Sequence, residues 1–170
     1  MPAQTPDRHP ELPLDADAEG LPPAHRRVPL VLVVAAGGAV GAPLRYALAR
    51  TLPTAPGAWP TATFVTNLLG AFLLGVLLEA LARLGPDAGP RRVVRLGLGT
   101  GVLGAFTTYS TLATEAVLLD RDGHPALAVA YGLASAVAGS AAAAAGVGLA
   151  ALGHRAARAV TVDPDRLGRG

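Results

Sequence analysis

Residues 96–114 read LGLGTGVLGAFTTYSTLAT, a stretch of 19 residues without a formal charge. Three further uncharged stretches occupy residues 28–44, 51–78 and 125–153. A helix that crosses a bilayer needs about 20 mostly apolar residues. Four such stretches in a chain of 170 residues leave little room for a soluble domain. The sequence therefore predicts an all-α membrane protein with four transmembrane helices.

The four stretches define one domain with a polar segment on each side. We expect a four-helix transmembrane domain at residues 29–152. Residues 1–28 are rich in proline and acidic residues and show no apolar period, which predicts a disordered N-terminal tail. Residues 153–170 are expected to form a polar C-terminal tail. Only 15% of the residues are charged, whereas soluble domains average about a quarter.

The composition gives no support for an enzyme. The chain has no cysteine, which excludes disulfides and thiolate metal sites, and its four histidines lie in the tails or the last loop. Residues 99–104 match GxGxxG, but a dinucleotide-binding loop needs a strand before it and a soluble βαβ unit around it. We find no nucleophile–base pair, metal cluster or phosphate loop in a suitable context.

The third expected helix contains glycines followed by a polar cluster, namely Gly97, Gly99, Gly101 and Gly104, then Thr107, Thr108, Tyr109, Ser110 and Thr111. Glycine and β-branched hydroxyl residues weaken a helix at its centre. Unwound backbone at membrane depth is tolerated where protein buries it or water reaches it, and its free groups can bind ions. We expect this helix to be broken near its centre. The alternative is a continuous helix whose hydroxyls bond to carbonyls four residues earlier.

Further polar residues lie inside the other expected spans. Asn67 could donate to an anion in a pore or tie two helices together, since a buried amide needs partners. Arg45 and Glu115 are costly in lipid unless they are paired or lie near a helix end. Tyr131 and Ser135 are spaced i, i+4 and share one face of the fourth helix. A polar face on an apolar helix indicates a bundle interior or an aqueous path.

Three segments together resemble the Fluc/CrcB family of fluoride channels. Residues 37–46, GGAVGAPLRY, resemble the glycine-rich first helix with its arginine. Residues 63–75, TFVTNLLGAFLLG, resemble the asparagine motif of the second helix, and residues 101–115 resemble the signature of the third. The tyrosine–serine pattern of the fourth helix also fits, so the resemblance covers about residues 29–152.

The resemblance implies an antiparallel dimer of four-helix subunits that lowers cytoplasmic fluoride by passive export across the bacterial inner membrane. It implies a structural Na⁺ at the dimer centre, held by the backbone carbonyls of Gly104 and Thr107. It also implies a fluoride pathway along Asn67, Tyr109, Ser110, Thr111, Leu112, Tyr131 and Ser135, with Arg45 and Glu115 in structural or interface roles. The family's two phenylalanines fall at Tyr109 and Leu112, which leaves the aromatic pair incomplete.

The arginines near the spans are distributed unevenly between the two sides. The side of the termini carries nine, and the other side carries two, Arg50 and Arg121. The positive-inside rule then places both termini in the cytoplasm. An antiparallel homodimer must insert both ways, so this bias predicts a heterodimer with a paralogous subunit, in which this chain could be a pore-inactive scaffold half. A small dual-topology multidrug exporter is the other alternative, although the first helix lacks the carboxylate that such exporters use.

Overall fold

The computed structural model describes residues 27–161, and the predicted tails at 1–26 and 162–170 lie outside the described residues. The regular structure consists entirely of helices over that range, as the sequence predicts. In chain order the elements are α1 (Val28–Thr51), α2 (Thr61–Leu84), α3 (Gly89–Val94), η2 (Arg95–Leu103), α4 (Gly104–Phe106), α5 (Tyr109–Arg121) and α6 (Pro125–Thr161).

Four helical segments are long and apolar enough to cross a bilayer, which confirms the predicted four spans. They are α1, α2, a third span made of α3, η2, α4 and α5 (Gly89–Arg121), and α6 as far as Arg155. The α6 helix continues to Thr161, past the predicted end of the domain at residue 152. Its 37 residues extend over about 55 Å, more than a hydrocarbon core of about 30 Å, so the end of α6 projects beyond the membrane.

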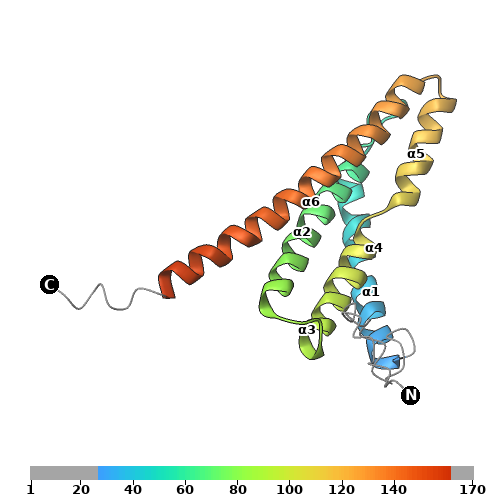
Figure 1. The fold of residues 1–170 in the computed structure, drawn as a ribbon. Helices are drawn as coiled ribbons and strands as arrows, with labels where there is room; N and C mark the ends of the chain where they lie inside the picture. Colours follow the sequence, from blue (N-terminus) through green and yellow to red (C-terminus); the bar gives the residue numbers. More distant parts are fainter. Residues whose placement is uncertain (1–26, 162–170) are drawn as a thin grey trace, which may run out of the picture.

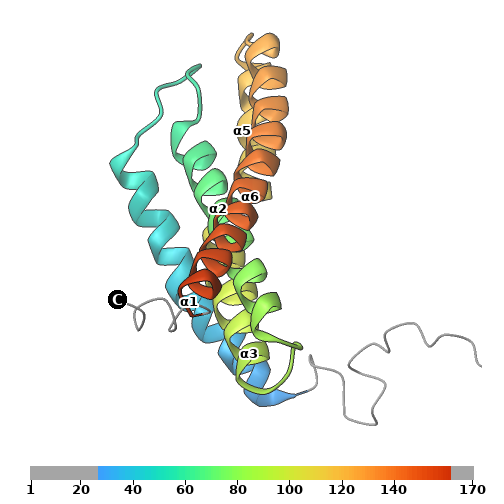
Figure 2. The same ribbon diagram turned by 60° about the vertical axis from the view of Figure 1, so that its left-hand side comes forward.

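The spans alternate in direction. The start of α1, the α2–α3 connection and the end of α6 lie toward one end of the bundle, while the α1–α2 loop and the α5–α6 turn lie toward the other (Figures 1 and 2). The α6 helix packs along α2 and α5, and α1 packs against η2 and α4. Among the residues that the structure describes, this arrangement puts Arg27, Arg83, Arg91, Arg92 and Arg155 toward one end of the bundle, as the sequence assigns them.

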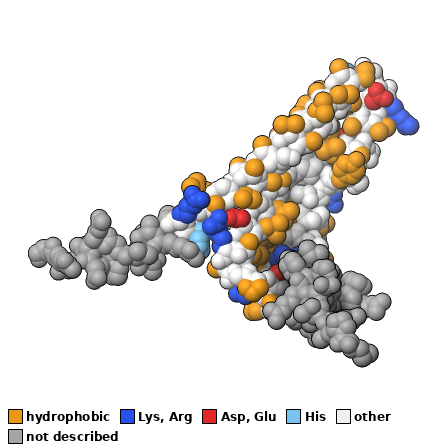
Figure 3. All heavy atoms as spheres, in the orientation of Figure 1, with side chains coloured by type: hydrophobic (Ala, Val, Ile, Leu, Met, Phe, Trp, Pro, Cys, Tyr) orange, Lys and Arg blue, Asp and Glu red, His pale blue; other side chains and the backbone are white. Residues whose placement is uncertain are grey.

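The outer surface is apolar. Large hydrophobic side chains such as Leu32, Leu133 and Val137 are mostly exposed. Figure 3 shows hydrophobic side chains along the length of the bundle, with most of the charged ones toward its ends. A soluble protein does not expose apolar surface on this scale, so the outer face is fitted to lipid.

Glycines let the helix backbones approach closely, as their GxxxG spacing predicts. A Cβ atom added at Gly37 would collide with the carbonyl oxygen of Gly97 on η2, and one at Gly41 would collide with that of Val102. On the other side of the bundle, a Cβ at Gly75 of α2 would collide with a carbonyl of α6. Helices in lipid associate through such backbone contacts because the hydrophobic effect contributes little between them.

The segment η2 is a π-helix, which the sequence analysis did not predict. Its nine residues, Arg95–Leu103, use the wider i+5 hydrogen-bond pattern, and the Gly104 N–H still donates to the Gly99 carbonyl. Such segments are rare and frequently occur at functional sites. Here the wide turns carry the glycines that face α1 and lead directly into the break in the third span.

Gly146→Ala should destabilise the folded chain, because the added Cβ would overlap the Phe72 carbonyl of α2, which cannot move without its helix. Overpacking at such a contact costs about 1–3 kcal/mol. Gly148→Ala is the matched control, since a Cβ there meets nothing within 4 Å. We would heat each variant in detergent and measure the fraction that stays monodisperse. Equal midpoints for the two variants would contradict this account of the α2–α6 contact.

Candidate functional site

The third span is broken near its centre, between α4 and α5. Thr107 has ψ 160° and Thr108 has φ −152° and ψ 121°, so both residues have extended backbone. Thr107 still closes α4, because its N–H and its Oγ1 each donate to the Leu103 carbonyl at 2.9 Å. The break predicted from the polar cluster is therefore present, and the continuous helix is excluded.

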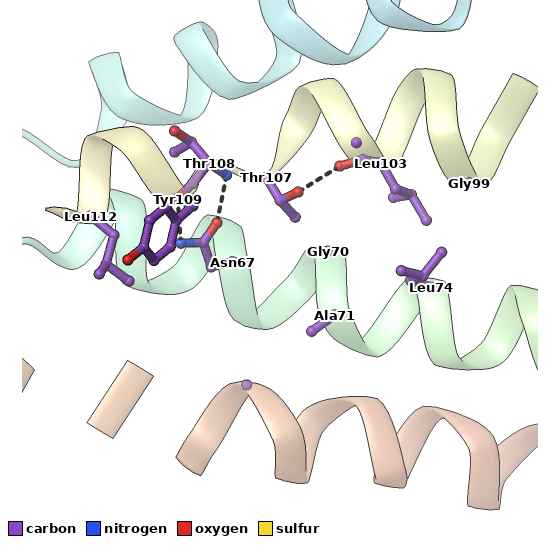
Figure 4. Close-up of a pocket in the computed structure, with 12 residues that line it drawn as sticks. Asn67, Gly70, Ala71, Leu74, Gly99, Leu103, Thr107, Thr108, Tyr109 and Leu112 are labelled. Atoms are coloured by element: carbon purple, nitrogen blue, oxygen red, sulfur yellow. Dashed lines mark hydrogen bonds between the residues drawn. The ribbon is translucent and has the colours of Figure 1, made fainter. Parts of the chain in front are cut away.

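The side chain of Asn67 on α2 completes the broken backbone. Its Nδ2 donates to the Thr108 carbonyl at 3.0 Å, and its Oδ1 accepts from the Thr108 N–H at 2.8 Å (Figure 4). The amide thus replaces the helical acceptor that the Thr108 N–H loses at the break, and it gives a second donor to the Thr108 carbonyl, which as the N-cap of α5 already accepts the first bond of that helix. Of the two roles that the sequence left open for Asn67, tying helices together is the one that these contacts serve.

The last carbonyls before the break lose their helical donors, and those of Gly104 and Thr107 are among them. In a continuous helix, the Gly104 carbonyl would accept from the Thr108 N–H and the Thr107 carbonyl from the Thr111 N–H. The Thr108 N–H donates instead to Asn67, and the Thr111 N–H donates to Thr108 Oγ1 at 3.1 Å. Gly104 and Thr107 are the residues that the resemblance assigns to sodium, and both line the same cavity.

That cavity has a volume of about 360 Å³ and lies between α2, the third span and α6. Its lining includes Asn67, Gly104, Thr107, Tyr109, Leu112 and Gly139. Tyr109 is 82% exposed in the single chain, and Leu112 is partly buried against the apolar cluster around Tyr131. The predicted residues at the break are therefore brought together, with one aromatic ring and one leucine at the cavity wall.

A second cavity, of about 240 Å³, lies on the α1 side of the break. Its lining includes Arg45, Tyr46, Thr63, Thr66, Thr108 and Thr111. Thr108 lines both cavities, and its Oγ1 is joined to Thr111 Oγ1 at 2.9 Å and to Ser110 Oγ at 3.2 Å. Arg45 thus contributes its charge to a cavity that also holds threonine hydroxyls, and the break separates this cavity from the first.

Glu115 is held by two hydroxyls inside the bundle. Thr63 Oγ1 donates to its Oε1 and the Tyr131 hydroxyl donates to its Oε2, both at 2.8 Å. Tyr131 is completely buried, which shows that the polar face of α6 points into the bundle. The sequence analysis did not select Thr63, although it lies four residues before Asn67 and so on the same helix face.

Two further features complete this region. Ser135 Oγ, one turn beyond Tyr131, is buried and has no hydrogen-bond partner among residues 27–161. Trp59 packs edge-on against Tyr131 and Phe64, with ring centroids 5.3 Å apart in each pair. Hydroxyl groups and one carboxylate therefore extend from the break along α5 and α6 to the aromatic residues near the α1–α2 loop.

The break can serve two kinds of ion. Unpaired carbonyls such as those of Gly104 and Thr107 favour a cation. The N-terminus of α5 carries the positive end of a helix dipole, and Arg45 adds a full positive charge in the second cavity. These groups favour an anion, and the cavity-lining hydroxyls of Thr108 and Thr111 can hydrogen-bond to it.

Comparison with known proteins gives a consistent family assignment. A family model described as CrcB-like protein, Camphor Resistance (CrcB), matches residues 32–147. The chain is 45% identical over 115 residues to the fluoride-specific ion channel FluC 1 of Cutibacterium acnes, covering 68% of this chain and 80% of the relative. It is 45% identical over 134 residues to FluC 2 of Leifsonia xyli, covering 78% and 92%. The chain therefore belongs to the CrcB family.

Proposed function

We propose that the chain is a subunit of a fluoride-specific ion channel that lets fluoride leave the cytoplasm passively. The observation that carries the proposal is the broken third span, whose polar groups face two cavities inside an otherwise apolar bundle. The names of the relatives support the same ion. Because the named relatives are ion channels, neither an enzymatic activity nor the multidrug export considered from the sequence is favoured for this chain.

The proposed fluoride pathway follows the predicted residues through the bundle. Asn67, Tyr109 and Leu112 lie at the first cavity, and an aromatic ring edge can face an anion because it carries the positive part of the quadrupole. Thr111, together with Ser110 beside it, supplies hydroxyls near the second cavity.

Farther along the bundle, the pathway includes Tyr131 and Ser135. Ser135 has an unused hydroxyl, whereas the Tyr131 hydroxyl already donates to Glu115. An ion at Tyr131 would therefore compete with the Glu115 carboxylate for that donor, which gives Glu115 a role in the proposed pathway.

A structural sodium ion fits the donor set at the break. The carbonyls of Gly104 and Thr107 are neutral oxygen donors without helical partners, and unwound carbonyls in transporters coordinate Na⁺. Two such ligands from one chain are too few for a closed coordination shell. A site shared with a second subunit would supply the others, and the ion would then fix both the break and the dimer.

The proposed assembly is an antiparallel dimer, either of two copies or with a paralogous subunit, with the termini of this chain in the cytoplasm. The arginine bias favours the paralogous partner. Leu112, which replaces an aromatic residue at the cavity wall, favours a second candidate function. In that alternative the chain contributes scaffold and sodium ligands while its own pore is inactive.

Fluoride efflux from liposomes tests the proposal directly. We expect fluoride-selective efflux from the purified chain either alone or together with a paralogue from its source organism, because the break supplies the ion-binding groups. Efflux only with the paralogue would identify a heterodimer. Chloride-loaded liposomes are the control. Absence of fluoride efflux from both preparations, with the chain folded and reconstituted, would overturn the proposed function.

Asn67→Asp should reduce efflux at least about tenfold in whichever combination conducts, since the loss of a paired donor inside protein costs about 1–3 kcal/mol. The variant keeps an acceptor for the Thr108 N–H but sets an oxygen against the Thr108 carbonyl. Thr114→Val is the control, because Thr114 Oγ1 makes one exposed bond to the Ser110 carbonyl. Efflux at the wild-type rate from Asn67→Asp would show that conduction does not need the two hydrogen bonds between Asn67 and Thr108.

Replacing Na⁺ by N-methyl-D-glucamine should lower the temperature at which the purified assembly dissociates. The carbonyls of Gly104 and Thr107 would then lose the ion that they coordinate in the proposed site. Size-exclusion chromatography after heating gives the temperature at which half of the assembly has dissociated. Titrating Na⁺ back at constant ionic strength should restore it, whereas the same concentration of the organic cation should not. A midpoint that is independent of Na⁺ would argue against the sodium site.

A further inference from the structure

A third cavity, of about 450 Å³, lies at the α2–α3 connection, away from the break in the third span. Leu78, Leu81 and Ala82 of α2 form an apolar wall. Arg91 and Arg95, together with the connection at residues 85–87, form the other wall. A cavity with one apolar and one cationic wall matches an amphiphile that has an anionic headgroup.

The guanidinium group of Arg91 is already held in place. Its Nε donates to the Pro86 carbonyl at 2.9 Å, and the guanidinium carbon lies where a side chain at Gly85 would contact it. Its two terminal amino groups have no hydrogen-bond partner within the part of the chain that the structure describes. A held guanidinium with two free N–H groups presents a planar fork that suits a phosphate group, and little side-chain freedom remains to be lost on binding.

Asp87 is the counter-charge of this cavity, and it compensates only part of the positive charge. Its carboxylate lies 2.8 Å from Arg95 and 3.7 Å from Arg92, and the hydrogen bond from Arg95 lowers the pKa of Asp87. The lining of the cavity holds two arginines against one aspartate, a net charge of +1 at neutral pH, and Arg92 beside Asp87 adds a further positive charge next to it. Glu79 does not change this balance, because it is paired with Arg83 on the same helix.

The cavity lies where a membrane ends. The second span stops at Leu84 and the third begins at Gly89, and the connection between them lies at one end of the bundle (Figure 2). The ends of two spans lie near the boundary of lipid and water. Leu78 is exposed on the outer surface of α2, as are Val93 and Val94 beyond the arginines. Lipid chains therefore reach this part of the bundle, and their phosphate groups lie at the depth of Arg91.

We propose that this cavity binds the phosphate group of an anionic phospholipid. Arg91 and Arg95 contact the phosphate oxygens, and an acyl chain lies along Leu78 and Leu81. Basic pockets between transmembrane helices bind anionic headgroups in this way. The bound lipid would link the end of α2 to the start of the third span. The proposal concerns a lipid site and does not depend on which ion the channel conducts.

Native mass spectrometry of the full chain in neutral detergent tests the proposal with added phosphatidylglycerol or phosphatidylcholine. We expect the unaltered chain to retain phosphatidylglycerol preferentially. Arg91→Gln should weaken its retention about tenfold, and Arg91→Lys should weaken it less, because lysine keeps the charge without the fork. Arg50→Gln, in the last turn of α1 and so at the end of the bundle away from the α2–α3 connection, should leave retention unchanged.

Any one of the following three outcomes would overturn the proposal. Equal loss in Arg91→Gln and Arg50→Gln would indicate non-specific attraction between charges. Equal retention of the two lipids by the unaltered chain would exclude selection of an anionic headgroup, and this comparison needs no variant. Displacement of the lipid by millimolar inorganic phosphate, with Arg91→Gln abolishing phosphate binding, would identify a site for free phosphate instead.

Discussion

The backbone hydrogen bonds of Thr108 are the constraint on which the rest of the structure depends. Inside a bilayer no water is available to replace a lost helical bond, so a break survives only where other groups of the protein replace it. Asn67 does this with one amide, which pairs with the N–H and the carbonyl of the same residue. Because the amide comes from α2, the break also fixes how α2 lies against the third span.

The glycine contacts hold the other helices around this point. Gly37 and Gly41 bring α1 onto η2, and Gly75 and Gly146 bring α2 onto α6. The wide turns of η2 end directly at α4, so the backbone that leads into the break is already packed on one face by α1. The two cavities lie on either side of Thr108, which lines both: glycines, threonines and leucines line the first, and alanines and threonines line most of the second.

Local composition was sufficient for the spans, but for the third helix it left a break and a continuous helix as alternatives, and the resemblance favoured the break. The long uncharged stretches predict four spans, and glycines followed by threonines predict a weak helix centre. The π-helix and the pairing of Asn67 with Thr108 were not predicted, since they depend on which helix lies beside which. Glu115 illustrates the same limit: its cost in lipid was evident, but its partners Thr63 and Tyr131 come from two other helices.

Structural and pore-lining features are separable in this chain. The break depends on Asn67 and on backbone groups, and the carbonyls of Gly104 and Thr107 would keep their positions whatever side chains stand beside them. The proposed pore depends instead on the side chains at Tyr109 and Leu112, which line the cavity without supporting the break. Leucine at 112 can therefore alter conduction through the proposed pore while the carbonyls of Gly104 and Thr107 and the packing stay intact. A subunit built this way remains useful to a partner even if its own pore does not conduct, which is consistent with an arginine bias that selects one orientation in the membrane.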